Sequence, residues 1–167
     1  MSQQNPSVYA AAIQAQLASI VTPVPVYANF NRNWSTQPKF LTWQLRNIHQ
    51  PVYTGSTQSI KGIDRPTFQI SVFATTMGDA FTLSNSILQS LHGYSGAFGT
   101  SSFAWLNNSG SAITWLNNSG LPISWISNAT TGLLYVSKAD VIWLYNTYDN
   151  DTNLHQIILD CTIDVPT

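Results

Sequence analysis

The stretch Thr67-Phe-Gln-Ile-Ser-Val-Phe-Ala-Thr75, with Thr76-Met-Gly-Asp-Ala80 directly after it, decides the fold of this 167-residue chain. Every second residue from Phe68 to Ala74 is apolar, and the intervening residues are polar except for Phe73. Because successive side chains of a strand point to opposite faces, this alternation predicts a strand with one buried face.

The residues after this strand predict a helix. Thr76 and Asp79 resemble a capping box in which Asp replaces the usual Glu. An apolar stripe at helical spacing follows, and Gly93 is a typical stop signal. The stripe comprises Ala80, Ser84, Ile87, Leu88 and Leu91.

An earlier helix is expected near the N-terminus. Asn5 is a good N-cap, and Pro6 suits the first helical position. The helix should end before Pro23, because proline cannot continue it. Its apolar stripe comprises Tyr9, Ile13, Leu17 and Ile20.

Further strands are expected on both sides of this central pattern, at Val26–Phe30, Phe40–Leu45, Val141–Tyr148 and Gln156–Val165. The last two should form a hairpin, because the residues between them are rich in Asp and Asn. The whole chain, residues 1–167, is therefore expected to be one α+β domain. Its sheet should be largely antiparallel, with both helices on one face.

A ten-residue repeat interrupts this pattern. Phe103-Ala-Trp-Leu-Asn-Asn-Ser-Gly110 returns as Ile113-Thr-Trp-Leu-Asn-Asn-Ser-Gly120, and a decayed third copy spans residues 123–130. A short strand and a tight turn fit this period, so residues 99–136 are predicted to be an inserted Trp-repeat β-meander. A short β-solenoid, in which the Trp residues stack in register, is the alternative. Three short strands cannot bury their large side chains alone, so the ribbon should lie on its own sheet or on another subunit.

Charge is scarce in this sequence. Lys, Arg and Asp supply 8% of the residues, Glu is absent, and the net charge is −1, whereas an average soluble domain has about 25% charged residues. Such a surface is easier to understand if much of it lies against partner chains. Tight nucleic-acid binding is not expected, because the six cations are scattered. A membrane partner is not expected either, since no apolar run approaches about 20 residues.

The residues do not form a recognisable catalytic or metal-binding pattern. The three His residues are far apart, and the single Cys161 excludes an intrachain disulfide. Asp160 and Asp164 share the polar face of the last strand, but residues four apart in a strand are separated by roughly 13 Å, too far for paired-carboxylate hydrolysis. Asp64, near Lys61 and Arg65, is interpreted as an ordinary loop charge. The chain is therefore not expected to be an enzyme or to need a cofactor.

Several of these segments resemble the phage tail-completion and tail-terminator family, which includes the terminators of lambda-like siphophages. The resemblance is carried by Val8–Ile20, Phe40–Leu45, Arg65–Ala74, Asp79-Ala80, Leu88–Tyr94 and His155–Asp160. With the connecting segments it covers about two-thirds of the chain, and Leu88-Gln-Ser-Leu-His-Gly-Tyr94 is its most telling part. The Trp repeat lies outside it.

The resemblance implies a structural virion protein that assembles in the host cytoplasm into a ring, usually a hexamer. Such a ring caps the tail tube, meets the head-side connector or stopper, and lets DNA pass as cargo. Two other functions remain open: a neck adaptor or stopper, and a carbohydrate-binding module that uses the Trp repeat.

Two groups of residues are candidate contact sites under this interpretation, and a third would line the channel. Lys61, Arg65 and the polar segment Gly55–Gly62 are predicted to form an arm that reaches a neighbouring subunit. The repeat residues Trp105, Trp115 and Trp125 are further candidates for contact with a subunit or partner. Asp160 and Asp164 are predicted to face the channel and to keep passing DNA from adhering.

Overall fold

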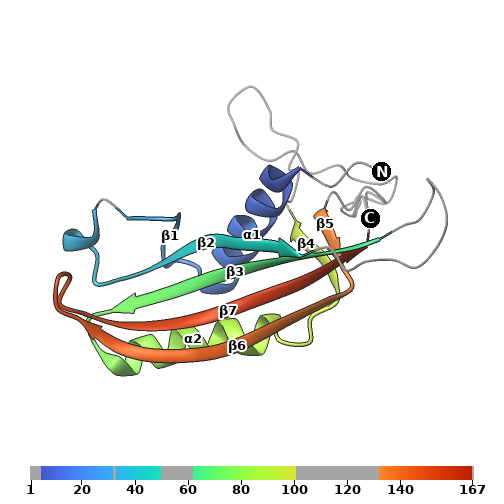
Figure 1. The fold of residues 1–167 in the computed structure, drawn as a ribbon. Coiled ribbons are helices and arrows are strands. Elements are labelled where there is room, and N and C mark those ends of the chain that lie inside the picture. The colour runs from blue at the N-terminus through green and yellow to red at the C-terminus, as the bar shows by residue number, and fades with distance from the viewer. Residues whose placement is uncertain (1–4, 32, 50–61, 101–131, 167) are drawn as a thin grey trace, which may run out of the picture.

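The computed structural model describes residues 5–31, 33–49, 62–100 and 132–166. Within these residues the chain forms a five-stranded sheet, a two-stranded ribbon and two α-helices, with one turn of 3₁₀ helix at Trp34–Thr36. The strands of the sheet are β1 (Val26–Ala28), β2 (Lys39–His49), β3 (Ile63–Ala74), β6 (Lys138–Asp149) and β7 (Leu154–Pro166). They lie in the order β1-β2-β3-β7-β6 (Figure 1). All neighbours are antiparallel except the short β1, which runs parallel to β2.

Strand β3 lies in the middle of this sheet. It pairs with β2 on one side, with Phe68 opposite Leu45, and with β7 on the other, with Phe68 opposite Cys161. The expected alternation is confirmed, because Phe68, Ile70, Val72 and Ala74 are fully buried. The predicted C-terminal hairpin is confirmed as well: β6 and β7 pair along their whole length across the turn between Asp149 and Leu154.

Helix α1 (Pro6–Val21) begins and ends where its sequence signals predicted. The Asn5 side chain accepts a hydrogen bond from the Ser7 N–H, and Pro6 occupies the first turn. Tyr9, Ile13 and Leu17 are buried at helical spacing. These residues attach the helix to the apolar face of the sheet.

Helix α2 (Met77–Leu91) begins at its predicted cap. The Thr76 hydroxyl accepts a hydrogen bond from the Asp79 N–H and donates one to the Asp79 carboxylate. The helix ends at Leu91, and Gly93 follows with a φ of 77°, in the left-handed region that glycine adopts without strain.

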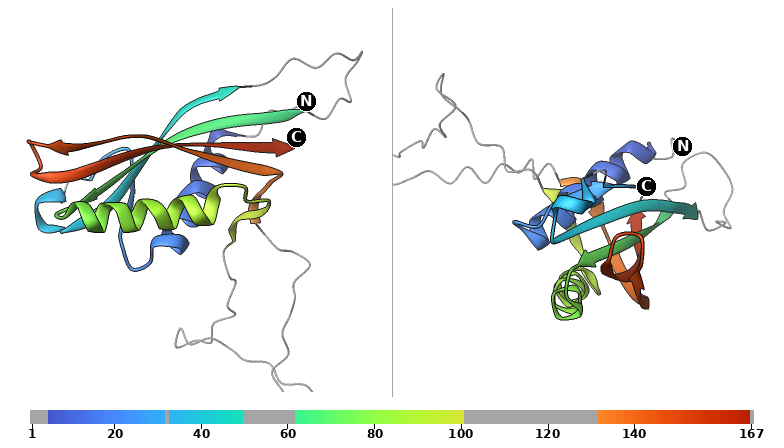
Figure 2. Two further views of the ribbon diagram at one scale, coloured as in Figure 1. Left: turned by 90° about the horizontal axis from the view of Figure 1, so that it is seen from below. Right: turned by 90° about the vertical axis from the view of Figure 1, so that its left-hand side faces the viewer.

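Both helices pack on the same face of the sheet. Their buried residues join the inward side chains of β2, β3, β7 and β6 in one apolar core. Figure 1 looks onto the opposite face, so α1 and α2 lie behind the strands, and Figure 2 shows the same layers from two other sides. The α+β class, the largely antiparallel sheet and the shared helical face are thus as predicted.

A two-stranded ribbon, β4 (Gly96–Thr100) with β5 (Gly132–Val136), was not predicted as such. The two strands are antiparallel, with Phe98 opposite Leu134, and both of these residues are buried. The ribbon joins the two ends of the segment in which the Trp repeat lies. Most of the meander predicted for residues 99–136, like most of the predicted arm at Gly55–Gly62, lies outside the described residues.

Gly99 allows β4 to approach α1 closely. Its N–H donates to the Gln16 side chain at 3.0 Å, and its φ is +71°. A Cβ placed there would lie 2.8 Å from the Ala12 Cα and 2.9 Å from the Ala12 carbonyl oxygen. The ribbon and the helix therefore meet backbone to backbone.

Gly99→Ala is expected to lower the free energy of unfolding by more than about 2 kcal/mol, because it adds left-handed strain to a clash with helix backbone. Gly78→Ala is the control, since Gly78 lies in α2 and a Cβ added to it would have no atom within 4 Å. That variant should become more stable by up to about 1 kcal/mol. Urea denaturation measures both. Equal effects at the two positions would contradict the close approach.

Candidate assembly surface

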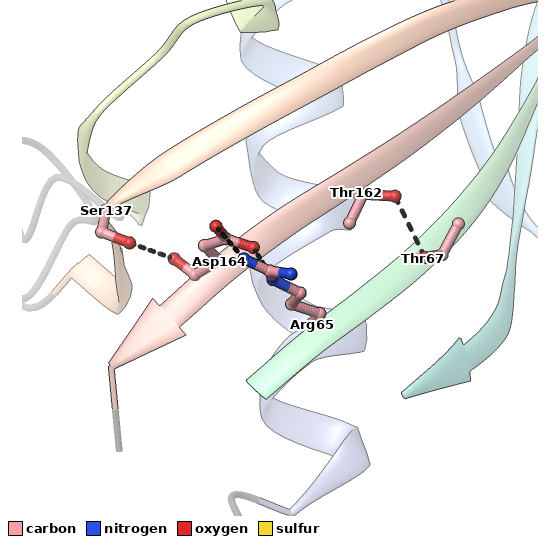
Figure 3. Close-up of polar contacts among 5 residues, drawn as sticks. All are labelled: Arg65, Thr67, Ser137, Thr162 and Asp164. Carbon is pink, nitrogen blue, oxygen red and sulfur yellow. Dashed lines mark hydrogen bonds and ion pairs between the residues drawn. The ribbon is translucent and has the colours of Figure 1, made fainter. Parts of the chain in front are cut away.

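The face of the sheet opposite the helices is lined with polar side chains. Arg65 on β3 forms an ion pair with Asp164 on β7, with Nε 2.8 Å from one carboxylate oxygen and a terminal nitrogen 3.3 Å from the other. Next to this pair, the hydroxyls of Thr67 and Thr162 lie 3.1 Å apart (Figure 3). These contacts join the two central strands, so the polar face is an ordered surface.

Positive and negative charges alternate across this face. Lys138 lies opposite Asp164 in the β6–β7 register, on the side of β7 away from Arg65. Further along, Arg46 donates to the Gln69 side chain, and Gln69 is opposite Asp160. Among the described residues of the sheet, this face thus carries three cations (Arg46, Arg65 and Lys138) and four carboxylates (Asp140, Asp149, Asp160 and Asp164), so its charges nearly cancel.

The structure brings two of the predicted site residues together. Arg65, predicted to belong to an arm, lies within β3 and contacts Asp164, predicted to face the channel. Asp160 lies on the same face, and one of its carboxylate oxygens is buried without a hydrogen-bond partner among the described residues. Lys61, Trp105, Trp115 and Trp125 lie outside the described residues.

The interpretation of Asp64 as an ordinary loop charge was wrong. Asp64 lies in β3, its exposed fraction is 2%, and it accepts a hydrogen bond from the Tyr9 hydroxyl of α1. Burial raises the pKa of the Tyr9 phenol above its usual value, and the hydrogen bond to Asp64 and its negative charge raise it further. The pair connects the first turns of α1 to the central strand, which is a structural role.

Cys161 is part of the core on the other side of β7. Its side chain is fully buried. Burial raises the pKa of the thiol from 9.0 to about 12, with smaller contributions from the charges of Asp140 and Asp160. At neutral pH the residue is therefore a small buried hydrophobe, as its place in the alternating pattern predicted.

Exposed apolar side chains gather along β6, the edge strand of the sheet. Ile142, Leu144, Tyr145 and Tyr148 are each 45–57% exposed. All five residues from Leu144 to Tyr148 are exposed, so this part of the strand is covered on neither face. The pattern was missed in the sequence, because periodicity alone does not say which strand lies at an edge.

A recess of about 210 Å³ lies on the polar face, near the β6–β7 turn. Its described lining is aromatic and amide-rich, and the rings of Phe40 and Phe73 stack there with centroids 4.8 Å apart. Asp149 is the one carboxylate in that described lining. Hydrolysis by paired carboxylates would need a second one beside it. The described residues also contain no cluster of three side chains that could hold a metal ion.

No protein-family model matches the chain, and no curated protein matches it. Among solved structures it is similar to a chain from the virion of a native gene transfer agent particle, with a TM-score of 0.46 and 12% identity over 96% of this chain and 92% of that one. It is also similar to a chain in the structure of the PVC sheath/tube terminator of an extracellular contractile injection system in its extended state. There the TM-score is 0.46 and the identity 10%, and the match covers 100% of this chain and 58% of the other. None of the helices in the described part of the chain is long and apolar enough to span a membrane.

Breaking the Arg65–Asp164 pair is expected to cost less than about 1 kcal/mol of folding free energy, because the Arg65 side chain is 45% exposed and exposed ion pairs contribute little. A double-mutant cycle with Arg65→Met and Asp164→Asn, followed by urea denaturation, measures the coupling. A coupling above about 2 kcal/mol would show that the pair is essential for the fold.

The Cys161 thiol is expected to resist iodoacetamide at pH 8 in the folded protein and to react at the normal rate in urea. Because its pKa is higher in the folded state, folding stability should fall as pH rises from about 9 towards 12. Cys161→Ala should remove this loss of stability at alkaline pH. The loss due to Tyr9, whose pKa is also raised in the folded protein, should remain. Rapid labelling of the folded protein would contradict the buried position.

Proposed function

We propose that this chain is a structural virion protein of a phage-like tail, which forms a ring that terminates the tail tube and joins it to the head-side connector. The observation that carries the proposal is the row of exposed apolar side chains on β6 in a chain with 8% charged residues. A free monomer of this size normally keeps apolar residues off an edge strand and disperses charges over its surface. Contact with other subunits accounts for both departures.

Ring formation fits the physical character of this surface. A ring needs heterologous contacts, in which two different patches of the chain meet and the rotation between copies closes. Apolar side chains and backbone groups can make such contacts without moving charges out of water. The resemblance to tail terminators supports six copies and a tail tube protein as the partner on one side.

The polar face is our candidate for the channel wall. It carries Asp160 and Asp164, and its three cations offset three of its four carboxylates. A nearly neutral wall neither binds DNA phosphates tightly nor strongly repels them. Passing DNA would therefore meet little resistance, and we propose a balanced wall in place of a purely acidic one.

The arm remains a proposal for the partner surface. Arg65 lies at the start of β3, directly after the segment Gly55–Gly62. Lys61 and Gly55–Gly62 would reach a neighbouring subunit from there. Trp105, Trp115 and Trp125 would contact a subunit or the tube from the insertion between β4 and β5.

A neck adaptor or stopper would show the same features and differs in its position in the particle. A carbohydrate-binding module is the candidate from another class, and it would use Trp105, Trp115 and Trp125 as stacking platforms. Binding on a glycan array that is lost in Trp115→Ala would support that module. A silent array would leave the ring proposal unaffected.

The purified protein is expected to form rings with a central hole, visible by negative-stain electron microscopy, with a mass near six copies by light scattering. Added tail tubes should carry one ring at one end. A protein that stays monomeric at micromolar to millimolar concentration, with and without tubes, would refute the proposal. Rings that bind the head-side connector but not the tube would favour the adaptor.

A further inference from the structure

The two edges of the sheet are each covered over one part of their length. On β2, the short β1 pairs with Leu41–Trp43. From Gln44 to His49 the same edge has no neighbouring strand among the described residues. This open segment of β2 lies at the end of the sheet that contains Arg65 and Asp164.

The β6 edge shows the reverse arrangement. Here the turn after α2 covers the beginning of the strand: Ala139 exchanges backbone hydrogen bonds with Gly93 and Tyr94, and the Val141 N–H donates to His92. From Ile142 to Asp149 no described backbone lies alongside the edge. This open segment contains the four exposed apolar side chains, and it lies at the end with the β6–β7 turn.

The two open segments are complementary in direction. Strands alternate from β2 through β3 and β7 to β6, so β6 runs antiparallel to β2. If β6 of one copy lay beside β2 of another in a continuing sheet, the alternation would be kept. The segments are also similar in length: the β6 segment has eight residues, and its central six, Trp143–Tyr148, are enough to pair with all of Gln44–His49.

The offset between the segments sets the geometry of such a contact. Through the registers, the centre of the β2 segment lies level with residues 140–141 of β6, about five residues from the centre of the β6 segment. If the two segments paired, each copy would be displaced from the previous one by roughly 17 Å along the strand direction. The four strands of a copy add a displacement of about 19 Å perpendicular to the strands. Strands would then tilt by about 42°, within the range of 35–45° found in closed barrels.

We propose that Trp143–Tyr148 of each copy pairs with Gln44–His49 of the next copy, so that the sheets close into one barrel at the centre of the ring. This inference rests on the proposed function and specifies its subunit contact. The helices are too bulky for the interior, so they lie outside and the polar face lines the channel. In Figure 1, which looks onto that face, β2 ends at the right of the sheet and β6 ends at the left. A copy added below would therefore be shifted to the left, which is the direction required by the right-handed coiling of a barrel whose interior is that face. Six copies give a backbone diameter of roughly 50 Å, wide enough for duplex DNA.

Another copy of this chain is the occupant that these edges fit. Two β6 edges could pair about a two-fold axis, but that arrangement would leave both β2 segments open. The head-to-tail contact covers both edges of every copy, as edge strands require. It also places Leu144 and Tyr145 beside a neighbour's strand that carries one charged side chain, Arg46, between Gln44 and His49.

The test uses one variant for each edge. Leu144→Lys with Tyr145→Lys adds two charges to the β6 segment, and Asn47→Lys with His49→Lys adds two to the β2 segment. Tyr135→Lys is the matched control, because Tyr135 is an aromatic strand residue that is 60% exposed but belongs to β5. Circular dichroism and thermal melting establish that each variant folds, and light scattering gives its mass.

Each edge variant alone is expected to be monomeric, while wild type and Tyr135→Lys form rings. An equimolar mixture of the two edge variants should form dimers, because one intact β6 segment and one intact β2 segment remain to meet. Rings formed by a folded β6 variant would overturn the inference and leave the proposed function standing. Dimers of the β2 variant alone would show two-fold β6 pairing, which also overturns it. A wild type that stays monomeric with and without tail tubes would refute both.

Discussion

The antiparallel pairing of β3 with β7 is the interaction on which the other elements depend. These strands meet along nearly their whole length, and each carries a row of buried apolar residues on one face. Against that face lie α1 and α2, which pair with no strand and are held by packing and, for α1, by side-chain hydrogen bonds such as that from Tyr9 to Asp64. On the opposite face the same two strands carry Arg65, Asp164 and the threonine pair. One strand pair thus organises both the core and the polar surface.

A sheet with helices on one face has a limited set of free surfaces. The polar face can be solvated, since its backbone groups are already paired within the sheet. The edges differ from the faces, because an edge strand exposes unpaired backbone N–H and C=O groups that can pair with a strand of another chain. Short covering pieces protect part of each edge here, β1 on β2 and the turn after α2 on β6. What they leave open is long enough to pair and differs between the two edges, which favours a directional contact over a two-fold one.

Local pattern predicted the elements that bury one face. The alternation at Phe68–Ala74, the caps at Asn5 and Thr76 and the hairpin all follow from residues close in sequence. Long-range contacts were not accessible in this way. Asp64 was misread because its partner Tyr9 lies 55 residues earlier, while its sequence neighbours Lys61 and Arg65 are charged. Arg65 and Asp164 lie 99 residues apart, and the exposure of β6 depends on its being at an edge. The ribbon β4–β5 was missed because Gly96-Ala-Phe-Gly-Thr100 is too short and glycine-rich to show a period.

The low number of charged residues has a consequence for the polar face if the proposed ring repeats that face around a channel. In a closed ring, any net charge on that face is multiplied by the number of copies and concentrated around one channel. One uncompensated cation per copy would give a hexamer six, and each phosphate so neutralised strengthens DNA binding through counterion release. A surplus of carboxylates would oppose the DNA in the same cumulative way. If the polar face lines the channel as proposed, the pairing of Arg65 with Asp164 and the near balance of three cations with four carboxylates would limit both effects. The amide and hydroxyl side chains of Asn, Gln, Ser and Thr then bind most of the surface water, which agrees with a chain that has 8% charged residues.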